Sequence, residues 1–484
     1  MTRPLFVTTT IPYVNAPPHI GFALELVQAD VIARYRRLIG REVRFQTGTD
    51  ENAFKNVLSA QARGVSVQQL VDENSTRFLR LTEALDVSTD HFQRTTDPAH
   101  RRAVNAFLAR LRPDDVFAAE YRGWYCTGCE DFYFESDAPD GACPEHGTPL
   151  VEVAERNHFF RLSAYQSRLH ELISSRRLQI LPAAREAEVL GFIERGLADI
   201  SLSRDATRSQ GWGIPYPGDE TQVVYVWIDA LINYLSGLGF PEGDAHRRWD
   251  DAVKCHVIGK NVWKFHAVYW PALLLSAGLA IPDRIVAHGF LTNEGRKISK
   301  SSGDAVDPVD YIDEFGADAV RYFLLRHVRP FDDSDFSVER LAAVYNADLS
   351  NGIGNLTSRL TALCESAAPC GITAPAGAPP SGFHEHVDAF RFDLALALLW
   401  GEIAELNREL GAARPWDDVK NGRLAAARGS LAPLVARLST AAHWLTPFLP
   451  RTARLIQGAL AAPSIRRSEP LFPRRGVTTG GHRR

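Results

Sequence analysis

A short strand, a proline-rich turn and an amphipathic helix together account for residues 5–38. Residues 5–9 are apolar and β-branched, which is typical of a strand buried in a parallel sheet. Three prolines end this run, and apolar side chains then recur every three or four residues from Gly21 to Leu38, which predicts a helix stopped by Gly40. Such a unit can bind an anion at the helix entrance, where His19 stands. Taken alone, it also fits an ordinary strand–helix unit with an exposed histidine.

Strand candidates and helical segments alternate after this unit. A second strand candidate covers residues 43–46, and helical segments follow it to about Arg112. Further strand candidates lie at residues 256–259 and 284–291, and residues 223–230 are typical of a strand that enters a helix. The alternation predicts a doubly wound parallel sheet of the Rossmann type, in which ligands bind at the carboxyl ends of the strands. Asp50 follows the second strand, so its carboxylate either binds a substrate amine or caps the next helix.

Composition limits the class of protein. A chain of 484 residues is too long for one ordinary core, so we expect two or three domains. It is 45% hydrophobic and 23% charged and has no apolar run long enough to span a bilayer, so we expect no membrane partner. The start lacks the apolar stretch of a secretion signal, which predicts a cytoplasmic protein. The net charge of −4 does not point to nucleic acid, so such a partner needs a local basic surface.

Four metal-ligating side chains occur in two pairs, each with two residues between its members. They are Cys126 with Cys129, and Cys143 with His146. This spacing predicts a tetrahedral structural zinc knuckle, because all four positions around the ion are filled by protein ligands. The alternative is three thiols without metal and a surface histidine.

Two further segments gain meaning only in combination with other residues. A helical stripe carries Val262, His266, Tyr269 and Leu273, with Trp270 beside it, and such a stripe is usually core packing. The polar loop 293–303 contains two lysines among small residues, which suits a mobile phosphate clamp or a solvated charged loop.

The last part of the chain reads as helical from Val338 onward. Apolar residues from Leu349 to Leu363 form one stripe, and residues 394–410 form another long segment. Residues 368–382 between them read as a flexible loop rich in proline, glycine and alanine. The end, residues 464–484, holds six arginines against one glutamate and little apolar material, so we expect an extended basic tail.

The chain resembles the class I aminoacyl-tRNA synthetases, and among them the methionyl-tRNA synthetases. The class motifs are the His-Ile-Gly that starts at His19 and the Lys-Ile-Ser-Lys-Ser that starts at Lys297. Segments similar to the methionyl enzymes are residues 11–13, 47–51, 225–227 and 265–266, Trp270-Pro271, Pro415-Trp416 and the cysteine pairs. Each motif is weak alone, but their order along residues 4–475 is specific.

The resemblance implies activation of L-methionine by ATP, with Mg²⁺, and transfer of the methionyl group to tRNA(Met). His19, Lys297 and Lys300 are then the catalytic residues that stabilise charge on the phosphates. The implied ATP-binding residues are His19, Gly21, Glu25, His288, Gly289, Lys297, Ile298 and Lys300. The implied methionine-binding residues are Ile11, Tyr13, Asp50, Arg204, Trp227, Ala230, Leu231, Tyr234, Val262, His266 and Trp270.

The resemblance also implies that Asn355, Arg359 and Trp416 read the anticodon, since such side chains can hydrogen-bond and stack with unpaired bases. The implied architecture is a Rossmann-type α/β catalytic domain with a zinc-knuckle insertion, followed by an all-α anticodon-binding domain. The expected segments are 1–115 and 179–290 (catalytic halves), 116–178 (insertion), 291–340 (lysine loop and stem contact), 341–463 (anticodon-binding domain) and 464–484 (basic tail).

The chain departs from the family pattern at a few positions. Phe22 replaces the second histidine of the first motif, and a phenyl ring cannot donate a hydrogen bond to phosphate. Asn261 and Ile298 replace an acidic residue and a methionine, and residues 52–54 differ from the usual His-Gly pattern. Two alternatives therefore remain open: a divergent paralog that serves another amino acid or a tRNA-dependent side pathway, and a tRNA-binding protein without catalysis.

Overall fold

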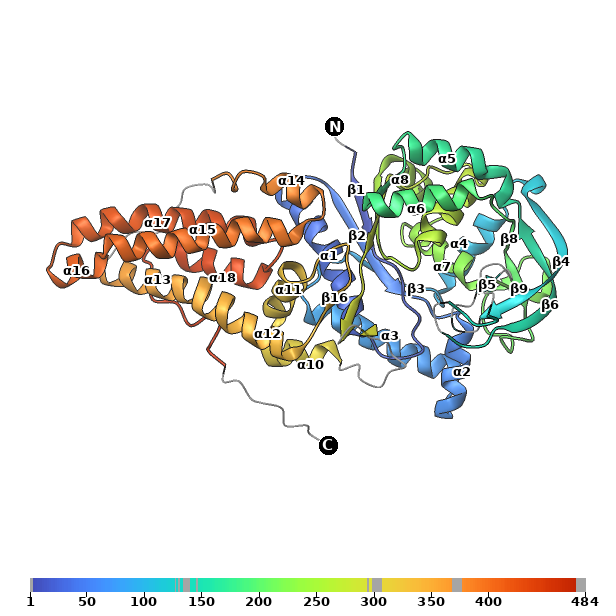
Figure 1. Ribbon diagram of the computed structural model, residues 1–484, viewed down its shortest axis with the longest axis horizontal. Helices are drawn as coiled ribbons and strands as arrows, with labels where there is room; N and C mark the ends of the chain where they lie inside the picture. Colours follow the sequence, from blue (N-terminus) through green and yellow to red (C-terminus); the bar gives the residue numbers. More distant parts are fainter. Residues whose placement is uncertain are drawn as a thin grey trace. The chain divides into compact units, whose positions relative to one another are not determined.

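The computed structural model describes residues 3–126, 128, 131–133, 140–144, 147–293, 296–297, 307–367 and 377–475 (Figure 1). The chain divides into two compact units. The first comprises Met1–Pro18, Gly40–Leu81 and Thr89–His288, and the second comprises His19–Ile39, Thr82–Ser88 and Gly289–Arg484. The domain boundaries expected from the sequence stay a prediction.

The first unit is built on a six-stranded sheet in which every pair of neighbours is parallel. Its order is β3 (His91–Arg94), β2 (Val43–Thr49), β1 (Leu5–Thr8), β12 (Val253–Gly259), β13 (Arg284–His288) and β7 (Gln179–Leu181). The chain moves from β1 to β2 on one side, whereas β12 pairs with β1 on the other, so the order reverses between β1 and β12. The predicted doubly wound parallel sheet is confirmed, and this reversal is where such sheets bind ligands.

Helices occupy much of the chain between these strands. They are α2 (Phe54–Arg63), α3 (Val67–Ala84), α4 (Pro98–Leu108), α5 (Gln166–Ser174), α6 (Ala183–Glu194), α7 (Val226–Ser236), α8 (Ala245–Asp251) and α9 (Trp270–Ser276). A large apolar core gathers Phe6 of β1 with Tyr234, Trp249 and Trp270 of the helices. Burial of these large aromatic side chains is the main favourable term that holds the helices to the sheet.

Two small antiparallel sheets lie in the segment between β3 and β12. One contains β4 (Val116–Cys126), β5 (Asp131–Tyr133), β6 (Val151–Phe160) and β8 (Ile200–Ser201), and the other contains β9 (Ser203–Asp205), β10 (Pro215–Tyr216) and β11 (Asp219–Val224). Long pairing between β4 and β6 brackets the cysteine segment, so the insertion is a β-structure rather than a knuckle alone.

Two sequence expectations for the sheet need correction. The segment up to Arg112 is not wholly helical, because residues 91–94 form β3; this short strand has polar residues and lies at the sheet edge, so it carries no apolar signal. The single strand expected at residues 284–291 is two strands: β13 ends at His288, and β14 (Leu291–Asn293) belongs to another sheet.

The second unit is mainly helical. Its helices are α1 (Ile20–Leu38), α10 (Pro308–Phe315), α11 (Ala317–Arg326), α12 (Val338–Val344), α13 (Asn355–Ala367), α14 (Phe383–Asp388), α15 (Phe392–Ala413), α16 (Pro415–Lys420), α17 (Leu424–Leu445) and α18 (Pro450–Ala461). A three-stranded sheet joins β14 to β15 (Arg296–Lys297) and β16 (Ser334–Asp335). The long helices α15 and α17 lie side by side (Figure 1), and Arg437 of α17 pairs with Glu402 and Glu409 of α15.

The stripe from Leu349 to Leu363 is not one regular helix. A π-helical segment, Tyr345–Gly354, separates α12 from α13, and its backbone kinks at Gly352. The apolar positions are nevertheless buried as expected, apart from the half-buried Leu363. Among the described residues, no helix combines the length and hydropathy needed to cross a membrane.

The basic tail buries more than its composition suggests. Ile465 and Phe472 are buried, and the phenyl ring of Phe472 lies edge-on to Tyr345 at 5.8 Å. The Tyr345 hydroxyl donates to the carbonyl oxygen of Pro473 at 3.0 Å. The expectation that this end has little to bury is therefore wrong as far as Arg475, because isolated apolar residues can find partners that no local pattern predicts.

Gly48 gives a test of the close contact between β2 and β3. A Cβ atom at Gly48 would lie 2.1 Å from the backbone oxygen of Gln93, so Gly48→Ala must push the strands apart. We expect a loss of at least about 2 kcal/mol of folding free energy, measured as a lower thermal midpoint. Gly191→Ala in α6 is the control, because its Cβ meets only the tip of Arg195 at 3.9 Å. A Gly48→Ala protein that melts with the parent would contradict the tight packing.

Candidate active site

Asp50 follows the carboxyl end of β2 and is held in place by backbone contacts. Its N–H donates to the carbonyl oxygen of Pro12 at 2.9 Å, and its backbone bridges to Tyr13. The Asp50 carboxylate accepts the backbone N–H of Asn52 at 3.3 Å and is only 1% exposed. Helix α2 is capped by Ala53 without any side-chain hydrogen bond, so Asp50 is not a helix cap. A buried carboxylate held in this way is suited to an ammonium ligand.

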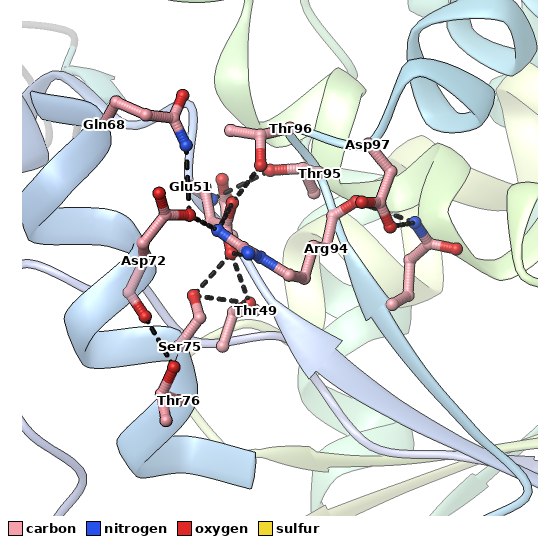
Figure 2. Close-up of polar contacts among 12 residues, drawn as sticks. Thr49, Glu51, Gln68, Asp72, Ser75, Thr76, Arg94, Thr95, Thr96 and Asp97 are labelled. Carbon is pink, nitrogen blue, oxygen red and sulfur yellow. Dashed lines mark hydrogen bonds and ion pairs between the residues drawn. The ribbon is translucent and has the colours of Figure 1, made fainter.

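Glu51, the next residue, is the centre of a charged network (Figure 2). The Arg94 guanidinium donates to both carboxylate oxygens, at 2.7 and 3.1 Å, and the hydroxyl groups of Thr49, Ser75 and Thr96 also donate to them. Burial alone lowers the pKa of Arg94, but its hydrogen bonds to Glu51 and Asp72 raise that pKa above the usual value. The network fixes the Glu51 side chain and with it the backbone that presents Asp50.

A second buried chain of hydrogen bonds starts at Asn52. Its amide donates to Asp229 Oδ2 at 2.7 Å, and Asp229 Oδ1 lies 2.5 Å from His100 Nε2. His100 Nδ1 in turn lies 2.8 Å from the Ser236 hydroxyl. Asn52 thus joins the loop after β2 to helix α7, which carries several of the expected methionine-binding residues.

Aromatic rings of the expected methionine pocket form two sets of ring contacts in the first unit. The Trp227 ring stacks on Phe265 with centroids 3.9 Å apart and an interplanar angle of 7°, and the Tyr13 ring lies 5.8 Å from Trp227. Tyr234 lies 6.2 Å from Trp270. Phe265 is absent from the expected site residues, although its place directly before His266 is a signal for it.

His266 lies on a π-helical turn, Phe265–Tyr269, where a regular helix is expected from the sequence. Its Nδ1 donates to the carbonyl oxygen of Val262 at 3.0 Å, since that oxygen can only accept. In the neutral imidazole, Nε2 is then an acceptor for the Tyr234 hydroxyl, 2.8 Å away. His266 is both a buried residue with its hydrogen bonds made and a part of the aromatic cluster. Core packing and the proposed methionine binding are therefore compatible roles for it.

The other expected methionine-binding residues also lie in this unit. Ala230 and Leu231 are buried on α7, and Ile11 is half-buried in the turn after β1. The Arg204 guanidinium lies over the Tyr225 ring at 3.7 Å and lines a small cavity that Asn52 and Trp212 also line. Arg204 thus shares a cavity with Asn52, whose backbone N–H donates to the Asp50 carboxylate.

The second unit contains the expected phosphate-binding residues of the first motif. His19 is the N-cap of α1, and its Nδ1 accepts the backbone N–H of Gly21 at 3.1 Å. A neutral imidazole with Nδ1 as acceptor carries its proton on Nε2, which is then a hydrogen-bond donor. A Cβ at Gly21 would lie 2.8 Å from His19 Cε1, so a larger residue at this position would displace the imidazole ring. Glu25 and Phe22 are both buried along the same helix.

The remaining nucleotide-binding candidates divide between the units. His288 ends β13 and is buried in the first unit, where its carbonyl oxygen accepts the N–H of Lys260 at 3.0 Å. Gly289 begins the next part of the second unit, and a Cβ there would lie 2.2 Å from the oxygen of Asp332. The backbone of Lys297 pairs with Thr292 in β15, whereas Ile298 and Lys300 lie outside the described residues.

Two of the three expected anticodon residues are in contact. The Arg359 guanidinium of α13 lies 5.9 Å from the Trp416 ring centroid, and both side chains are half-exposed. Asn355, one helical turn before Arg359, is exposed at the start of α13. Trp416 is therefore not a fully buried core residue but a half-exposed ring next to a cation.

Only half of the expected zinc ligands can be described. Cys126 and Cys143 are buried in one cluster with Leu150, while Cys129 and His146 lie outside the described residues. No group of three or more His, Cys, Asp or Glu side chains that could hold a metal occurs in the described part of the chain.

Residues 5–150 and 146–361 match the sequence profile of the family described as "tRNA synthetases class I (M)". The methionine--tRNA ligase of Brucella suis is 38% identical over 481 residues, which cover 96% of this chain and 92% of that protein. The methionine--tRNA ligase of Mycobacterium bovis is 41% identical over 435 residues, 86% of this chain and 83% of that protein. This chain belongs to the methionyl-tRNA synthetase family. It is an aminoacyl-tRNA ligase of class I.

Solved structures agree with this assignment. Mycobacterium tuberculosis methionyl-tRNA synthetase in complex with methionyl-adenylate superposes with a TM-score of 0.89 at 36% identity, covering 98% of this chain and 100% of that one. The apo form of the same synthetase superposes with a TM-score of 0.81 at 34% identity. The class I fold and the family expected from the two motifs are confirmed.

His256, in β12, makes the folding stability depend on pH. It is wholly buried, its Nδ1 lies 2.6 Å from the Thr8 hydroxyl, and burial together with His266 and Lys254 holds its pKa well below the ordinary value. The unfolded chain binds a proton below pH about 6.5 while the folded chain does not, so stability falls as the pH decreases from there, by up to about 1.4 kcal/mol per pH unit.

We expect His256→Gln to reduce this acid-side slope of the thermal midpoint between pH 7 and pH 5. His246→Gln, at an exposed histidine of α8, is the matched control and leaves the slope as in the parent. Equal slopes for the parent and His256→Gln would mean that His256 is protonated in the folded enzyme.

Proposed function

We propose that this synthetase forms methionyl-adenylate from methionine and ATP and then transfers the methionyl group to tRNA(Met). A methionine carboxylate oxygen attacks the α-phosphorus of ATP, and the bond to the leaving pyrophosphate breaks. The terminal hydroxyl of the tRNA then attacks the methionyl carbonyl carbon, and AMP leaves. Mg²⁺ accompanies ATP as part of that substrate. We expect both reactions to take place in the cytoplasm.

In this proposal Asp50 binds the methionine ammonium group, with Arg204 orienting it. The support is the buried, backbone-fixed Asp50 carboxylate beside the Glu51–Arg94 network. The thioether side chain packs among the rings of Trp227, Tyr234 and Trp270, since sulfur interacts favourably with aromatic edges. The single observation that carries the assignment is the contact between the Trp227 and Tyr13 rings next to Asp50, whose backbone bridges to Tyr13.

His19, Lys297 and Lys300 stabilise the negative charge that moves onto pyrophosphate. The Gly21 N–H holds His19 with Nε2 as the donor, so this imidazole can hydrogen-bond a phosphate oxygen without becoming charged. Glu25, His288, Gly289 and Ile298 are assigned to the nucleoside, where Gly289 leaves no room for a side chain. Phe22 removes one donor from this set, so the remaining groups carry more of the stabilisation.

Asn355, Arg359 and Trp416 are proposed to read the anticodon of tRNA(Met). The cation–ring contact between Arg359 and Trp416 presents an aromatic face and guanidinium donors together, which suits an unstacked base. Asn355 adds an amide that can pair with a base edge on the same helix face.

We further propose that Cys126, Cys129, Cys143 and His146 hold a structural zinc ion. The donor set fits, because the thiols of Cys126 and Cys143 share one buried cluster. Cys143 also begins a tight turn, in which the N–H of Gly147, with φ of +64°, donates to the Cys143 carbonyl oxygen. Zinc would fasten the end of β4 to this turn, and no catalytic step needs it.

ATP–pyrophosphate exchange with each amino acid tests the main proposal. We expect methionine to dominate, and we expect Asp50→Asn to raise the KM for methionine about tenfold or more, because a charged hydrogen bond of about 1.5–3 kcal/mol is lost. Asp251→Asn, at an exposed carboxylate of the same unit, is the control. Exchange with another amino acid would identify a divergent paralog, and tRNA(Met) binding without any exchange would identify a non-catalytic binding protein.

Metal analysis tests the zinc site. Purified protein should contain about one zinc ion per chain, because the four ligands close one tetrahedral site. Cys126→Ala should lose the metal, whereas Cys255→Ala, at another buried cysteine in β12, should keep it. Metal retained by Cys126→Ala, or absent from the parent, would rule out this ligand set.

A further inference from the structure

Asp30 lies in the middle of α1 and is a wholly buried carboxylate in which both oxygens are used. Its Oδ1 accepts the backbone N–H and the hydroxyl of Ser88, at 2.7 and 2.6 Å. Its Oδ2 lies 2.8 Å from Arg34 Nε and 2.7 Å from a guanidinium nitrogen of Arg321. Burial raises the Asp30 pKa, but the two arginines and Ser88 outweigh it and keep the pKa below the usual value, so the group is charged.

Arg321, on α11, is buried as completely as Asp30, and its remaining donors bind backbone oxygens. Nε donates to Phe448 at 2.7 Å, and the two terminal nitrogens donate to Pro447 at 2.9 Å and to Leu85 at 3.3 Å. Pro447 and Phe448 form the turn between α17 and α18. One guanidinium therefore connects α1 to α11, to the turn between α17 and α18, and to the segment that contains Leu85.

A carboxyl group of α11 contacts the other side of the same turn. Asp318 stands one helical turn before Arg321, and its carboxylate accepts the backbone N–H of Thr452, in the first turn of α18, at 2.6 Å. Arg321 thus donates to carbonyl oxygens on the α17 side of the turn, while Asp318 accepts an N–H on the α18 side. The two contacts leave α11 little freedom to rotate relative to this turn.

Stability alone does not explain the Asp30–Arg321 pair. A buried ion pair is expensive to desolvate, and well-packed apolar residues of similar volume often stabilise a protein as well or better. The pair instead fixes the position of α1. A planar guanidinium whose contacts all have fixed geometry restrains both sliding of the bound helix along its axis and rotation about that axis.

The helix that is fixed in this way carries His19. Asp30 is eleven residues from His19, so about 16 Å of continuous helix separates them. Rotation or sliding of α1 at Asp30 is transmitted to its amino end, where the Gly21 N–H sets the orientation of the imidazole. A displacement of about 1 Å at a reacting group can reduce a rate by about two orders of magnitude.

We propose that Asp30 and Arg321 are positioning residues of the adenylation step, which fix α1 so that His19 presents Nε2 to the phosphates. This inference rests on the role proposed above for His19. The pair acts through α1 and touches no substrate itself.

The test compares ATP–pyrophosphate exchange in the parent, Arg321→Lys and the double variant Asp30→Asn/Arg321→Met. Lysine keeps the charge without the planar fork, and the double variant removes both charges of the pair while Arg34 keeps Asp86 as an ion-pair partner at 3.8 Å, so at least one of them is expected to fold. We expect kcat/KM for ATP to fall about tenfold or more in both, with KM for methionine unchanged. The control is Arg437→Met, which breaks the half-exposed pairs with Glu402 and Glu409 and should keep the parent rate.

His19→Ala separates positioning from a general loss of structure. If the pair acts through His19, the double variant should have little further effect once His19→Ala is present, whereas a general structural defect would lower the rate by the same factor in both backgrounds. Parent kinetics in the two folded pair variants, or an undiminished effect in the His19→Ala background, would overturn the positioning role. Exchange unaffected by His19→Ala would instead show that the proposed role of His19 itself is wrong.

Discussion

The parallel direction of the six sheet strands is the constraint on which the first unit depends. Since all six run the same way, their carboxyl ends share one edge, and Thr9, Asp50, Gly259 and His288 come to this edge from distant parts of the chain. The strand order reverses between β1 and β12, where connecting segments diverge and a ligand crevice can form. The fold therefore fixes residues proposed to bind methionine at one edge of the sheet, and such preorganisation lowers the entropic penalty of binding.

Buried charged side chains in this protein fix the positions of neighbouring elements. The carboxylates of Glu51 in the first unit and Asp30 in the second each accept several hydrogen bonds, including those of a guanidinium. Isolated charges at such depth would be strongly unfavourable, and saturation by donors makes them tolerable without making them large sources of stability. Each network lies on or next to an element with a proposed function, the Asp50 loop in one case and the His19 helix in the other. Precise placement of those elements is a consistent reason for both.

Local sequence patterns predicted the elements whose signal lies within a few consecutive residues. Helix α1 ends where the Gly40 stop signal places it, and the strands β1 and β12 lie at their apolar runs, although β12 already begins at Val253. The edge strand β3 and the kink at Gly352 were not predictable, because β3 has no apolar alternation and the kink interrupts an otherwise continuous stripe. Arg94 gave no signal either, since its partner Glu51 is far from it in the sequence.

The sequence by itself determined the family, the class of reaction and the types of side chain available, because ordered motifs such as those at His19 and Lys297 are properties of the chain. Only the tertiary structure decided how those side chains are used. It made Asp50 a fixed carboxylate rather than a helix cap, brought Trp416 next to Arg359, and joined Asp30 to Arg321. The physical reason is that hydrogen bonds, ring contacts and ion pairs between distant residues depend on distances in space, which spacing along the chain does not encode.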